Sequence, residues 1–508
     1  MRHQIPLSEF IIRLREEDLL IYWQGDANAI IEDIQYDSRK VSANTLFLCK
    51  GAHFEPEYIA KAKEAGAIAY LAMRPFDEGE ELTSLIVKDI RKALAVVADV
   101  FFESPWKKLT MIGVTGTKGK STTVTLLKAI LDADARKNAA PMTGLTSSAR
   151  VVDGKVDQAA VLTTPENIDL YRHLDNAVES GLHRMIVEVS SQALKYHRVG
   201  QIQFDHGVFL NIAPDHISDI EHPDFEDYFS SKRMLFDVCK HAYINPNSEH
   251  YDVILESAQK VGAVTTFAID NEADYRAVHI SDEGKGTAFE LQYEDKAFNI
   301  CTAMKGLFNV ENALAASSVA LTLGVDEDTI RETLAEVQLA GHMVYRHSAD
   351  GVTVIVDYAH NDISFRKVFE TVHHEFPNMP IYCVFGSAGS KAQSRRPDLG
   401  RVASKEATRI YLVPDDPAKE EIEAINAEIS AAFTCSVPFV SLTDRENGIK
   451  DAILSAPKDA VVLLLGKGGE VAQKGPNGAE PYAGDLALAE EYIAQRNSQG
   501  QQPSVYFL

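Results

Sequence analysis

The sequence of 508 residues is longer than one hydrophobic core usually organises, so we expect about three domains. Acidic residues outnumber basic ones and give a net charge of −24, which argues against a nucleic-acid partner that relies on a broad basic surface. The five cysteines are scattered, odd in number and without C-x-x-C spacing, as expected in a reduced cytoplasm.

The N-terminal part of the chain, residues 1–107, mixes short strand-like runs with one long helix-like segment, which predicts a smaller N-terminal α/β domain. Its first segment, MRHQIPLSEF, has no apolar leader, and no stretch of the sequence approaches membrane-spanning length. We therefore expect a cytoplasmic protein without a membrane partner.

Between residues 108 and 340, apolar runs alternate with helical patterns at 109–114, 185–189 and 207–210. This alternation predicts a central parallel sheet with helices on both faces. The same alternation returns in residues 341–508, where it predicts a C-terminal Rossmann-like α/β domain with strands at 352–356, 381–385, 410–413 and 461–465. Ligands bind beyond the carboxyl ends of such strands, so polar residues in those turns are candidates for chemistry.

Residues 113–122 read GVTGTKGKST and join an apolar run to a helix expected to begin at Lys120. Unpaired backbone N–H groups at a helix start, a lysine ammonium and a hydroxyl able to reach Mg²⁺ together form a polyphosphate site. The pattern departs from strict G-x-x-x-x-G-K-[ST], because Val114 stands where the first glycine belongs. A glycine-rich turn without a ligand is the alternative. The residues predicted to bind ATP or GTP phosphates are Gly116, Thr117, Lys118, Gly119, Lys120, Ser121 and Thr122.

Two later strand ends carry candidate Mg²⁺ ligands. Glu188 ends an apolar run, where a carboxylate is costly unless it is paired or binds a metal; a solvated strand-end charge is the alternative. His216 follows the next run and could ligate a second Mg²⁺, although a lone histidine is usually structural. The turn Thr163-Thr164-Pro165-Glu166 could hold phosphate or substrate, but its sequence also fits an ordinary helix cap.

Eight motifs occur in an order and at separations that resemble the Mur ligases: GTKGKST, TTPE, EVSSQA, NIAPDH, YFSSKRMLF, FNVENALAA, DYAH and GKGGE. The resemblance is closest to the type that adds the third residue of the peptidoglycan stem peptide to UDP-N-acetylmuramoyl-L-alanyl-D-glutamate. It extends from Tyr36 to about Asp485. It implies an ATP-dependent ligase, which we expect to act as a monomer.

The resemblance implies roles for matching residues. Ser38 and Arg39 would bind the uridine nucleotide. The adenine of ATP would face Asn309 and Asn312, and the nucleotide would be closed in by Asp357, Tyr358 and His360. The muramoyl peptide would bind Thr163, Thr164, Ser190, Gln192 and Arg198. The catalytic residues would be Lys120, Glu188, His216 and Lys232, and the Mg²⁺ ligands Ser121, Glu188, His216 and Lys232.

Lys232 matches the lysine that is carbamoylated in this family. The modification turns a cation into an anionic oxygen donor that can help to bind Mg²⁺. A lysine amine must be neutral to take up CO₂, and burial beside cations lowers its pKa from about 10.4. Without the resemblance, Lys232 would be interpreted as an exposed helix charge.

The predicted amino-acid pocket favours a side-chain ammonium. Relatives that add meso-diaminopimelate carry D-N-P-R, whose arginine clamps the distal carboxylate. The corresponding turn here is Asp415-Asp416-Pro417-Ala418, in which Ala418 offers no charge. Asp415, Asp416 and Glu470 can instead surround an ammonium, as in the lysine-adding type. Lys391, with Arg395 or Arg396 nearby, would hold the backbone carboxylate of L-lysine.

The sequence departs from the family pattern at two positions. His342 replaces the arginine of a Gly-Arg-Met motif, and Lys391 replaces the arginine of G-G-D-R by a point charge. These departures leave open a non-catalytic nucleotide-binding regulatory paralogue. A folylpolyglutamate synthetase is a second alternative, but it lacks a first domain with a Tyr-Asp-Ser-Arg turn. The sequence favours ATP-dependent addition of L-lysine to UDP-N-acetylmuramoyl-L-alanyl-D-glutamate, with ATP and Mg²⁺ required.

Overall fold

The computed structural model describes residues 3–51, 54–218, 221–282, 286–337, 343–389, 393 and 395–499. The chain is a mixed α/β protein that divides into two compact units. The first unit contains the described residues up to 337, except for 216–218, 221–223 and 304–306, which group with the second unit. Each unit is described by itself below.

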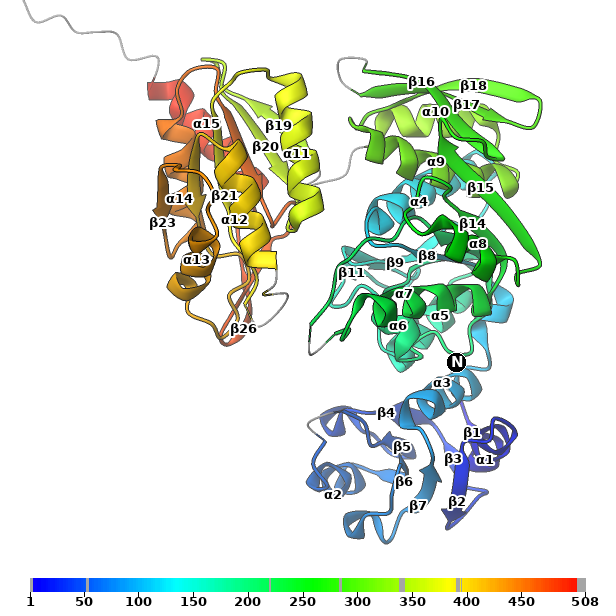
Figure 1. Ribbon diagram of the computed structural model, residues 1–508. Coiled ribbons are helices and arrows are strands. Elements are labelled where there is room, and N and C mark those ends of the chain that lie inside the picture. The colour runs from blue at the N-terminus through cyan, green and yellow to red at the C-terminus, as the bar shows by residue number, and fades with distance from the viewer. Residues whose placement is uncertain are drawn as a thin grey trace, which may run out of the picture. The chain divides into compact units, whose positions relative to one another are not determined.

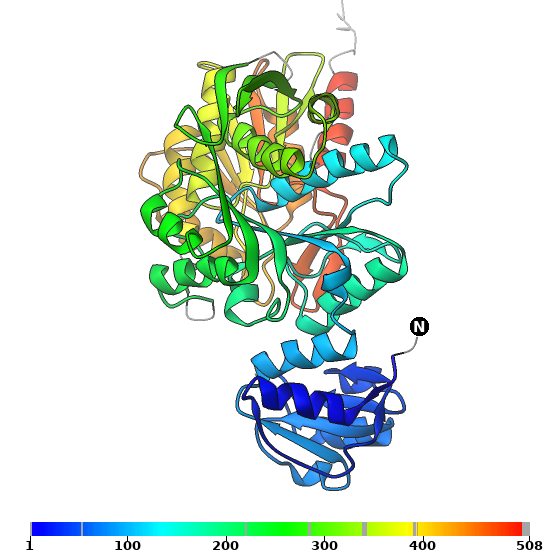
Figure 2. The ribbon, with the colours of Figure 1, turned by 90° about the vertical axis from the view of Figure 1, so that its right-hand side faces the viewer.

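The first unit begins with a small α/β layer, which confirms the predicted N-terminal fold. Its five-stranded sheet has the order β2 (Leu20–Gln24), β7 (Thr83–Val87), β6 (Ala67–Ala72), β5 (Thr45–Leu48) and β4 (Asp33–Gln35). Only β2 is antiparallel to its neighbour. Helices α1 (Leu7–Glu16) and α3 (Ile90–Phe101) pack side by side on this sheet, in blue in Figure 2, and α2 (Glu57–Glu64) packs on β6. A short strand pair, β1 (Ile5–Pro6) and β3 (Ile30–Ile31), completes the layer.

The larger sheet of the first unit has a parallel centre, as the alternating apolar runs predicted. Its parallel strands lie in the order β9 (Gly144–Thr146), β12 (Arg184–Glu188), β8 (Thr110–Thr115), β13 (Phe204–Phe209), β14 (Cys239–Ile244), β15 (Ala263–Ile269) and β16 (Tyr275–Asp282). The three predicted strands are therefore adjacent in the sheet. Their carboxyl ends meet at one edge, where the predicted site residues lie.

Antiparallel strands extend this sheet at both ends, which the sequence did not predict. They are β10 (Arg150–Val152) and β11 (Asp157–Ala159) at one end, and β17 (Thr287–Tyr293) and β18 (Lys296–Thr302) at the other. In β17 buried and half-buried residues alternate, as in a sheet with one face on a core and one toward solvent. Such short alternating strands lack the continuous apolar runs on which the prediction rested.

Seven helices of the first unit lie beyond the N-terminal layer in the described sequence: α4 (Lys120–Lys137), α5 (Asn167–Glu179), α6 (Ser191–Lys195), α7 (Phe225–Arg233), α8 (Tyr251–Ala258), α9 (Leu307–Thr322) and α10 (Glu327–Glu336). Helix α4 packs against α9, and α3 packs against α5 (Figure 1). A continuous apolar core therefore joins the N-terminal layer to the larger sheet. The predicted boundary near residue 107 lies between α3 and β8 and stays a prediction, as does the one near 340.

The second unit is a six-stranded sheet in the order β19 (Val344–His347), β20 (Thr353–Asp357), β24 (Val461–Leu465), β21 (Ile381–Phe385), β22 (Arg409–Leu412) and β23 (Phe439–Ser441). All strands except β19 are parallel to their neighbours. A hairpin of β25 (Ala472–Gly475) and β26 (Gly478–Pro481) follows β24.

Helices cover both faces of this second sheet (Figure 1). Ile355 of β20 packs with apolar residues of α11 (Asp362–Glu375), α12 (Arg395–Glu406) and α13 (Ile422–Ala431). Its neighbours Val354 and Val356 pack on the other face, with α14 (Arg445–Ser455) and α15 (Asp485–Gln499). Successive residues of a strand point to opposite faces, so apolar runs of this kind predict a sheet buried on both sides, as observed.

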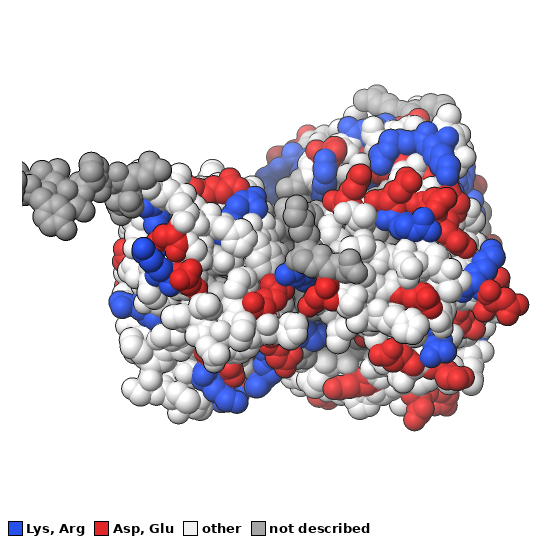
Figure 3. All heavy atoms as spheres, turned by 90° about the horizontal axis from the view of Figure 1, so that it is seen from above, with Lys and Arg blue, Asp and Glu red and all other residues white. Residues whose placement is uncertain are grey.

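The described helices include none that is both long and apolar enough to cross a membrane. On the face drawn in Figure 3, acidic and basic side chains are interspersed. One buried pair lies in the second unit: Arg445 forms a bidentate ion pair with Asp485, with N–O distances of 2.8 and 2.7 Å. The same guanidinium donates to the Leu465 carbonyl at 2.9 Å and so ties α14 and α15 to the end of β24.

Candidate active site

The predicted phosphate loop joins β8 to α4. Gly119, the residue before the helix, has φ +83°, a left-handed conformation that favours glycine. A Cβ atom at this position would lie 2.2 Å from Oδ1 of Asn312 on α9. The close approach of α9 therefore requires glycine here, and the loop leads directly into a helix N-terminus able to bind an anion.

The strand next to β8 supports this loop through Asn211. The Thr117 N–H donates to the Asn211 carbonyl at 3.0 Å, and the Lys118 N–H donates to Oδ1 of the same residue at 2.9 Å. The ammonium of Lys118 forms a 3.1 Å ion pair with Asp215. Residues of the NIAPDH motif thus hold the loop in shape, a contribution that the sequence alone did not assign.

Two predicted catalytic lysines converge on one carbonyl of the loop. Nζ of Lys120 lies 3.0 Å and Nζ of Lys232 lies 2.8 Å from the Gly116 carbonyl oxygen. Enclosure of the ammonium lowers the pKa of Lys120. Lys232 is 1% exposed, and its burial, together with the charges of Lys120 and Lys118, holds its pKa well below the usual value. The structure therefore buries Lys232 against the loop instead of exposing it.

Glu188 ends β12 beside the start of α4 and is 1% exposed. One carboxylate oxygen accepts a hydrogen bond from the Ser121 hydroxyl at 3.0 Å. The other accepts from the N–H and the hydroxyl of Ser148, at 2.9 and 3.0 Å. A carboxylate and a hydroxyl in contact are oxygen ligands of the kind that Mg²⁺ prefers. In the chain as described, no three His, Cys, Asp or Glu side chains gather as a metal-binding group.

His216 belongs to the segment that groups with the second unit. It has φ +57°, and its Nδ1 lies 3.3 Å from Oε1 of Glu221. Its role as a Mg²⁺ ligand stays a prediction.

Several of the predicted peptide-binding residues are brought together by the fold. The Thr164 hydroxyl donates to the Glu188 carbonyl at 2.7 Å and accepts from the Ser190 N–H at 3.0 Å. Arg198 donates to the Thr164 carbonyl at 3.1 Å. Thr163 precedes this cluster, and Gln192 lies in the first turn of α6. The TTPE and EVSSQA motifs thus form one hydrogen-bonded cluster next to Glu188.

The N-terminal layer contacts the region of the TTPE motif through pairs of side chains that the sequence did not predict. The ammonium of Lys50 contacts Glu166, whose other oxygen accepts from Arg198 at 2.8 Å. The Tyr36 hydroxyl donates to Asp169. Lys50 follows a buried strand, which is the signal that could have identified it.

The predicted uridine residues lie in a short 3₁₀ helix, Ser38–Lys40. The Arg39 side chain is 87% exposed and forms a bidentate pair with Asp37, with N–O distances of 2.9 and 2.8 Å. This hydrogen-bonded pair lowers the pKa of Asp37 to about 2. Arg39 is therefore accessible, with its guanidinium paired to Asp37, and its role in binding the uridine nucleotide stays a prediction.

Among the predicted nucleotide residues, Asn309 and Asn312 lie buried on α9. Asn312 accepts a hydrogen bond from the Thr123 hydroxyl at 3.3 Å and so faces the beginning of α4. Asp357, at the end of β20, accepts hydrogen bonds from the N–H groups of Met343 and Ala359 at 2.8 and 2.7 Å. Asp357 thus shapes the turn that follows its strand.

The acidic residues predicted to form a pocket lie together in the second unit, but an ammonium already lies among them. Lys467, in the turn after β24, is fully buried and lies 2.9 Å from Oδ1 of Asp416 and 2.5 Å from Oε2 of Glu470. Its distance to Oδ1 of Asp415 is 3.9 Å. The Tyr358 hydroxyl donates to Glu470 at 3.0 Å. We call Asp415, Asp416, Glu470 and Lys467 the acidic cluster.

The carboxylates of the acidic cluster differ in their partners. Asp416 accepts hydrogen bonds from Lys467 and from the Lys474 N–H; burial opposes its ionisation, but these contacts lower its pKa. The carboxylate of Asp415 accepts no hydrogen bond within the described residues, and burial raises its pKa to about 6. Asp415 thus differs from Asp416 in having no hydrogen-bond donor to its carboxylate among the described residues.

The other residues predicted to bind the incoming amino acid differ in their surroundings. Pro417 and Ala418 continue the turn, and Ala418 has φ +53°. Arg396 is fully buried and pairs with Glu420 and Glu428 at 2.7 and 2.8 Å. Its guanidinium is thus already engaged. Lys391 and His342 lie outside the described residues.

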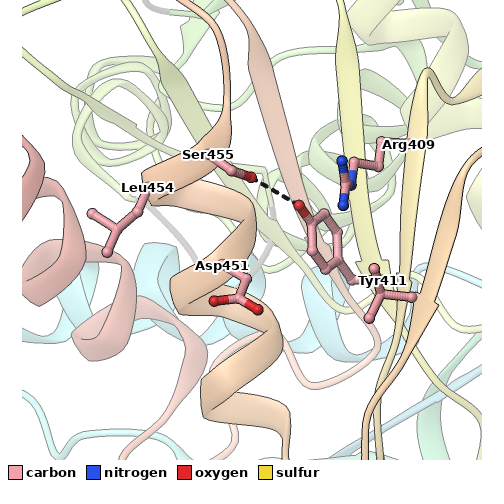
Figure 4. Close-up of a pocket in the computed structure, with 6 residues that line it drawn as sticks. Arg409, Tyr411, Asp451, Leu454 and Ser455 are labelled. Atoms are coloured by element: carbon pink, nitrogen blue, oxygen red, sulfur yellow. Dashed lines mark hydrogen bonds between the residues drawn. The ribbon is translucent and has the colours of Figure 1, made fainter.

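A separate cavity of about 290 Å³ opens between β22 and α14 in the second unit (Figure 4). It is lined by Arg409, Tyr411, Val440, Asp451, Leu454 and Ser455, none of which is a predicted site residue. The Tyr411 hydroxyl lies 2.9 Å from the Ser455 hydroxyl.

Comparison with known proteins identifies the family of this chain. Residues 114–320 match the Mur ligase middle domain, and residues 342–468 match the Mur ligase glutamate ligase domain. The chain belongs to the Mur ligase family, whose members are ATP-dependent ligases.

Similar proteins cover nearly the whole chain. A UDP-N-acetylmuramoyl-L-alanyl-D-glutamate--L-lysine ligase of Enterococcus faecalis is 39% identical, over 91% of this chain and 92% of its own. A UDP-N-acetylmuramyl-tripeptide synthetase of Lactobacillus delbrueckii is 36% identical, over 97% and 99%.

Solved structures share the fold. A UDP-N-acetylmuramoyl-L-alanyl-D-glutamate--2,6-diaminopimelate ligase matches with a TM-score of 0.66 and 22% identity, over 98% of this chain and 100% of its own. A folylpolyglutamate synthase of Mycobacterium tuberculosis matches with a TM-score of 0.59 and 16% identity, over 81% and 96%. These structures support the predicted three-domain α/β architecture.

Sequence reasoning did not identify Lys467 and Ser148 as members of the site. Lys467 stands in the GKGGE turn two residues after a predicted strand, so its position at a strand end was an available signal. Ser148 lies in a turn between two short strands, and its contact with Glu188 depends on the sheet order.

Proposed function

We propose that this protein uses ATP to join L-lysine to the D-glutamate of UDP-N-acetylmuramoyl-L-alanyl-D-glutamate, a step of peptidoglycan biosynthesis. The observation that carries the proposal is the similarity to lysine-adding ligases over more than nine-tenths of the chain, at 39 and 36% identity. The phosphate loop beside Glu188 supports the phosphoryl-transfer part of this reaction.

The proposed reaction has two steps. The γ-phosphoryl group of ATP passes to the γ-carboxylate of D-glutamate, which gives ADP and an acyl phosphate. The neutral α-amine of L-lysine then attacks the acyl carbon, the amide bond forms, inorganic phosphate leaves and the amine loses a proton. The protein contributes orientation and charge neutralisation and shields the acyl phosphate from water.

The phosphates would bind the loop from Gly116 to Thr122, with Lys120 as its cation. Ser121 and Glu188 fit Mg²⁺ because their oxygens are in contact at 3.0 Å, and His216 and a modified Lys232 would add further ligands. Mg²⁺, when bound, would neutralise phosphate charge. Asn309, Asn312 and Asp357 would hold the rest of the nucleotide.

The muramoyl peptide would bind the surface formed by Thr163, Thr164, Ser190, Gln192 and Arg198, with its uridine at Ser38 and Arg39. Arg198 is half-buried and is held by Glu166 at 2.8 Å, so its position is set before the substrate arrives. L-Lysine would enter the turn of Asp415, Asp416, Pro417 and Ala418 with Glu470, and Lys391 would hold its carboxylate.

We predict that Lys232 carries a carbamate. Its lowered pKa makes the neutral amine available; the amine attacks CO₂, an N–C bond forms and a proton leaves. Lys232→Ala should lose activity and regain part of it with small carboxylic acids. Lys240→Ala, which removes an exposed lysine (62% exposed), is the matched control. Full activity of Lys232→Ala, or electron density that ends in an unmodified ammonium, would contradict the prediction.

The acceptor is tested by ATP-dependent phosphate release with L-lysine, L-ornithine and meso-diaminopimelate, with the peptide product identified by mass. We expect L-lysine to exceed meso-diaminopimelate in kcat/KM by about 10³-fold or more, because an unpaired carboxylate among acidic side chains costs several kcal/mol. Ala418→Arg should narrow the gap. Equal or better use of diaminopimelate would refute lysine selection, and release with folate substrates instead of the UDP-sugar would refute the proposed function.

A further inference from the structure

The ammonium of Lys467 occupies the centre of the acidic cluster. It is fully buried and contacts Asp416 and Glu470 at 2.9 and 2.5 Å, with Asp415 further away at 3.9 Å. Burial opposes protonation of Lys467, but the surrounding carboxylates raise its pKa. A cation therefore lies inside the turn where the proposed acceptor's side chain would bind.

We propose that Asp416 and Lys467 form a specificity-determining ion pair, in which Asp416 withholds the cluster's cation from the side chain of the incoming amino acid. The inference rests on the proposed function and explains how the same pocket accepts an ammonium and rejects a carboxylate. Selection of L-lysine over diaminopimelate would thus depend on the Asp416–Lys467 ion pair, in addition to the absence of a charge at Ala418.

Other cations around the turn are also engaged. Arg445 donates to the Pro414 carbonyl at 3.4 Å, but its guanidinium is bound in bidentate fashion by Asp485. Arg396 is held by Glu420 and Glu428. Lys474, whose charge also acts on Asp416, is exposed. Of the cations near this turn, Lys467 is the one buried inside the cluster, so it is the cation that a second carboxylate of the acceptor would meet there.

Of the two members of the ion pair, Asp416 is the one whose substitution should disturb the structure least. The diaminopimelate-adding pattern D-N-P-R has asparagine at this position, so an uncharged amide is compatible with the turn. Asparagine can still accept hydrogen bonds from Lys467 and from the Lys474 N–H through Oδ1, but it supplies no charge. Asp416→Asn should leave Lys467 with Glu470 at 2.5 Å and the more distant Asp415 at 3.9 Å as its only charged partners in the acidic cluster, and so better able to pair a substrate carboxylate.

Loss of the Asp416 charge would also favour use of diaminopimelate by removing repulsion between the two carboxylates, without any role for Lys467. A double-mutant cycle separates the two explanations. The measured quantity is kcat/KM for meso-diaminopimelate divided by kcat/KM for L-lysine, in wild type, Asp416→Asn, Lys467→Met and the double variant. Asp451→Asn is the matched control, because it removes an exposed carboxylate of the same unit outside the acidic cluster.

We expect Asp416→Asn to raise this ratio by about tenfold or more, and by less than about twofold when Lys467 is methionine. Asp416→Glu, which keeps the charge, should leave the ratio near the wild-type value. It provides a second test of the ion pair if the Lys467→Met variant does not fold. An equal rise with and without Lys467, an equal rise in Asp416→Glu, or no rise at all overturns the ion pair while leaving the proposed function intact. If wild type uses neither amino acid, the proposed function itself fails, and this inference with it.

Discussion

At the scale of single residues, Lys120 and Lys232 share the Gly116 carbonyl as an acceptor, at 3.0 and 2.8 Å. Two ammonium groups close to one oxygen repel each other, and burial adds to the cost of keeping both charged. The arrangement favours a neutral Lys232 beside a charged Lys120. This arrangement supports the proposed roles, in which Lys232 is modified and Lys120 binds phosphate.

Lys120→Ala should reduce ATP-dependent turnover by about 10²–10³-fold or more, because a positioned charge at the transferring phosphoryl group is lost. Lys137→Ala, which removes an exposed lysine at the other end of α4, is the control and should keep wild-type turnover. Steady-state phosphate release measures both. Near-wild-type turnover of Lys120→Ala would remove this lysine from the phosphate site.

At the scale of elements, the start of α4 depends on the helix packed beside it. Gly119 combines a left-handed backbone with a Cβ direction that points at Asn312 on α9. The loop, the helix start and α9 thus pack together as one element, at which we propose that phosphate binds.

Gly119→Ala should weaken ATP binding by about tenfold or more, because an added methyl group must push aside the Asn312 side chain and the left-handed backbone disfavours alanine. Gly324→Ala is the matched control, since Gly324 has φ +85° but no atom within 4 Å of an added Cβ. The control should lose about 1 kcal/mol of stability from backbone strain and keep its ATP affinity. Titration calorimetry and denaturant unfolding measure the two quantities. Equal ATP affinity in both variants would show that Asn312 yields without cost.

At the scale of the whole molecule, Asp415 of the acidic cluster makes the stability of the protein depend on pH. Burial raises the pKa of Asp415 to about 6, so the folded protein binds this proton more tightly than the unfolded chain does. The contribution of Asp415 to stability therefore decreases as the pH rises from about 4 to about 6 and stays lower above that range.

Asp415→Asn should raise the free energy of unfolding by about 1–3 kcal/mol near pH 7.5, because it removes a buried charge without a hydrogen-bond partner. The gain should shrink as the pH falls toward about 4.5, where Asp415 is protonated in the folded state. Chemical denaturation across this range measures the gain, with Asp451→Asn as an exposed control whose effect should not change with pH. A destabilised Asp415→Asn at pH 7.5 would mean that Lys467 fully compensates this carboxylate.

The sequence determined those features that arise from neighbouring residues. Strands β21 and β24 were predicted at their observed bounds, because continuous apolar runs describe strands buried on both faces. The phosphate loop was recognisable because its glycines, lysine and hydroxyl occupy consecutive positions. The family followed from eight such local motifs in order.

Only the tertiary structure decided which distant side chains meet. Asp416 and Lys467 are 51 positions apart, and their contact requires that β22 and β24 flank β21 in one sheet. Ser148 reaches Glu188, and Lys50 reaches Glu166, for the same reason: these contacts depend on strand order and on packing between layers. Local periodicity records whether a residue is buried, but it does not record its partner. A group of acidic residues after β22 could therefore be predicted from the sequence, but only the folded structure shows that a lysine lies among them.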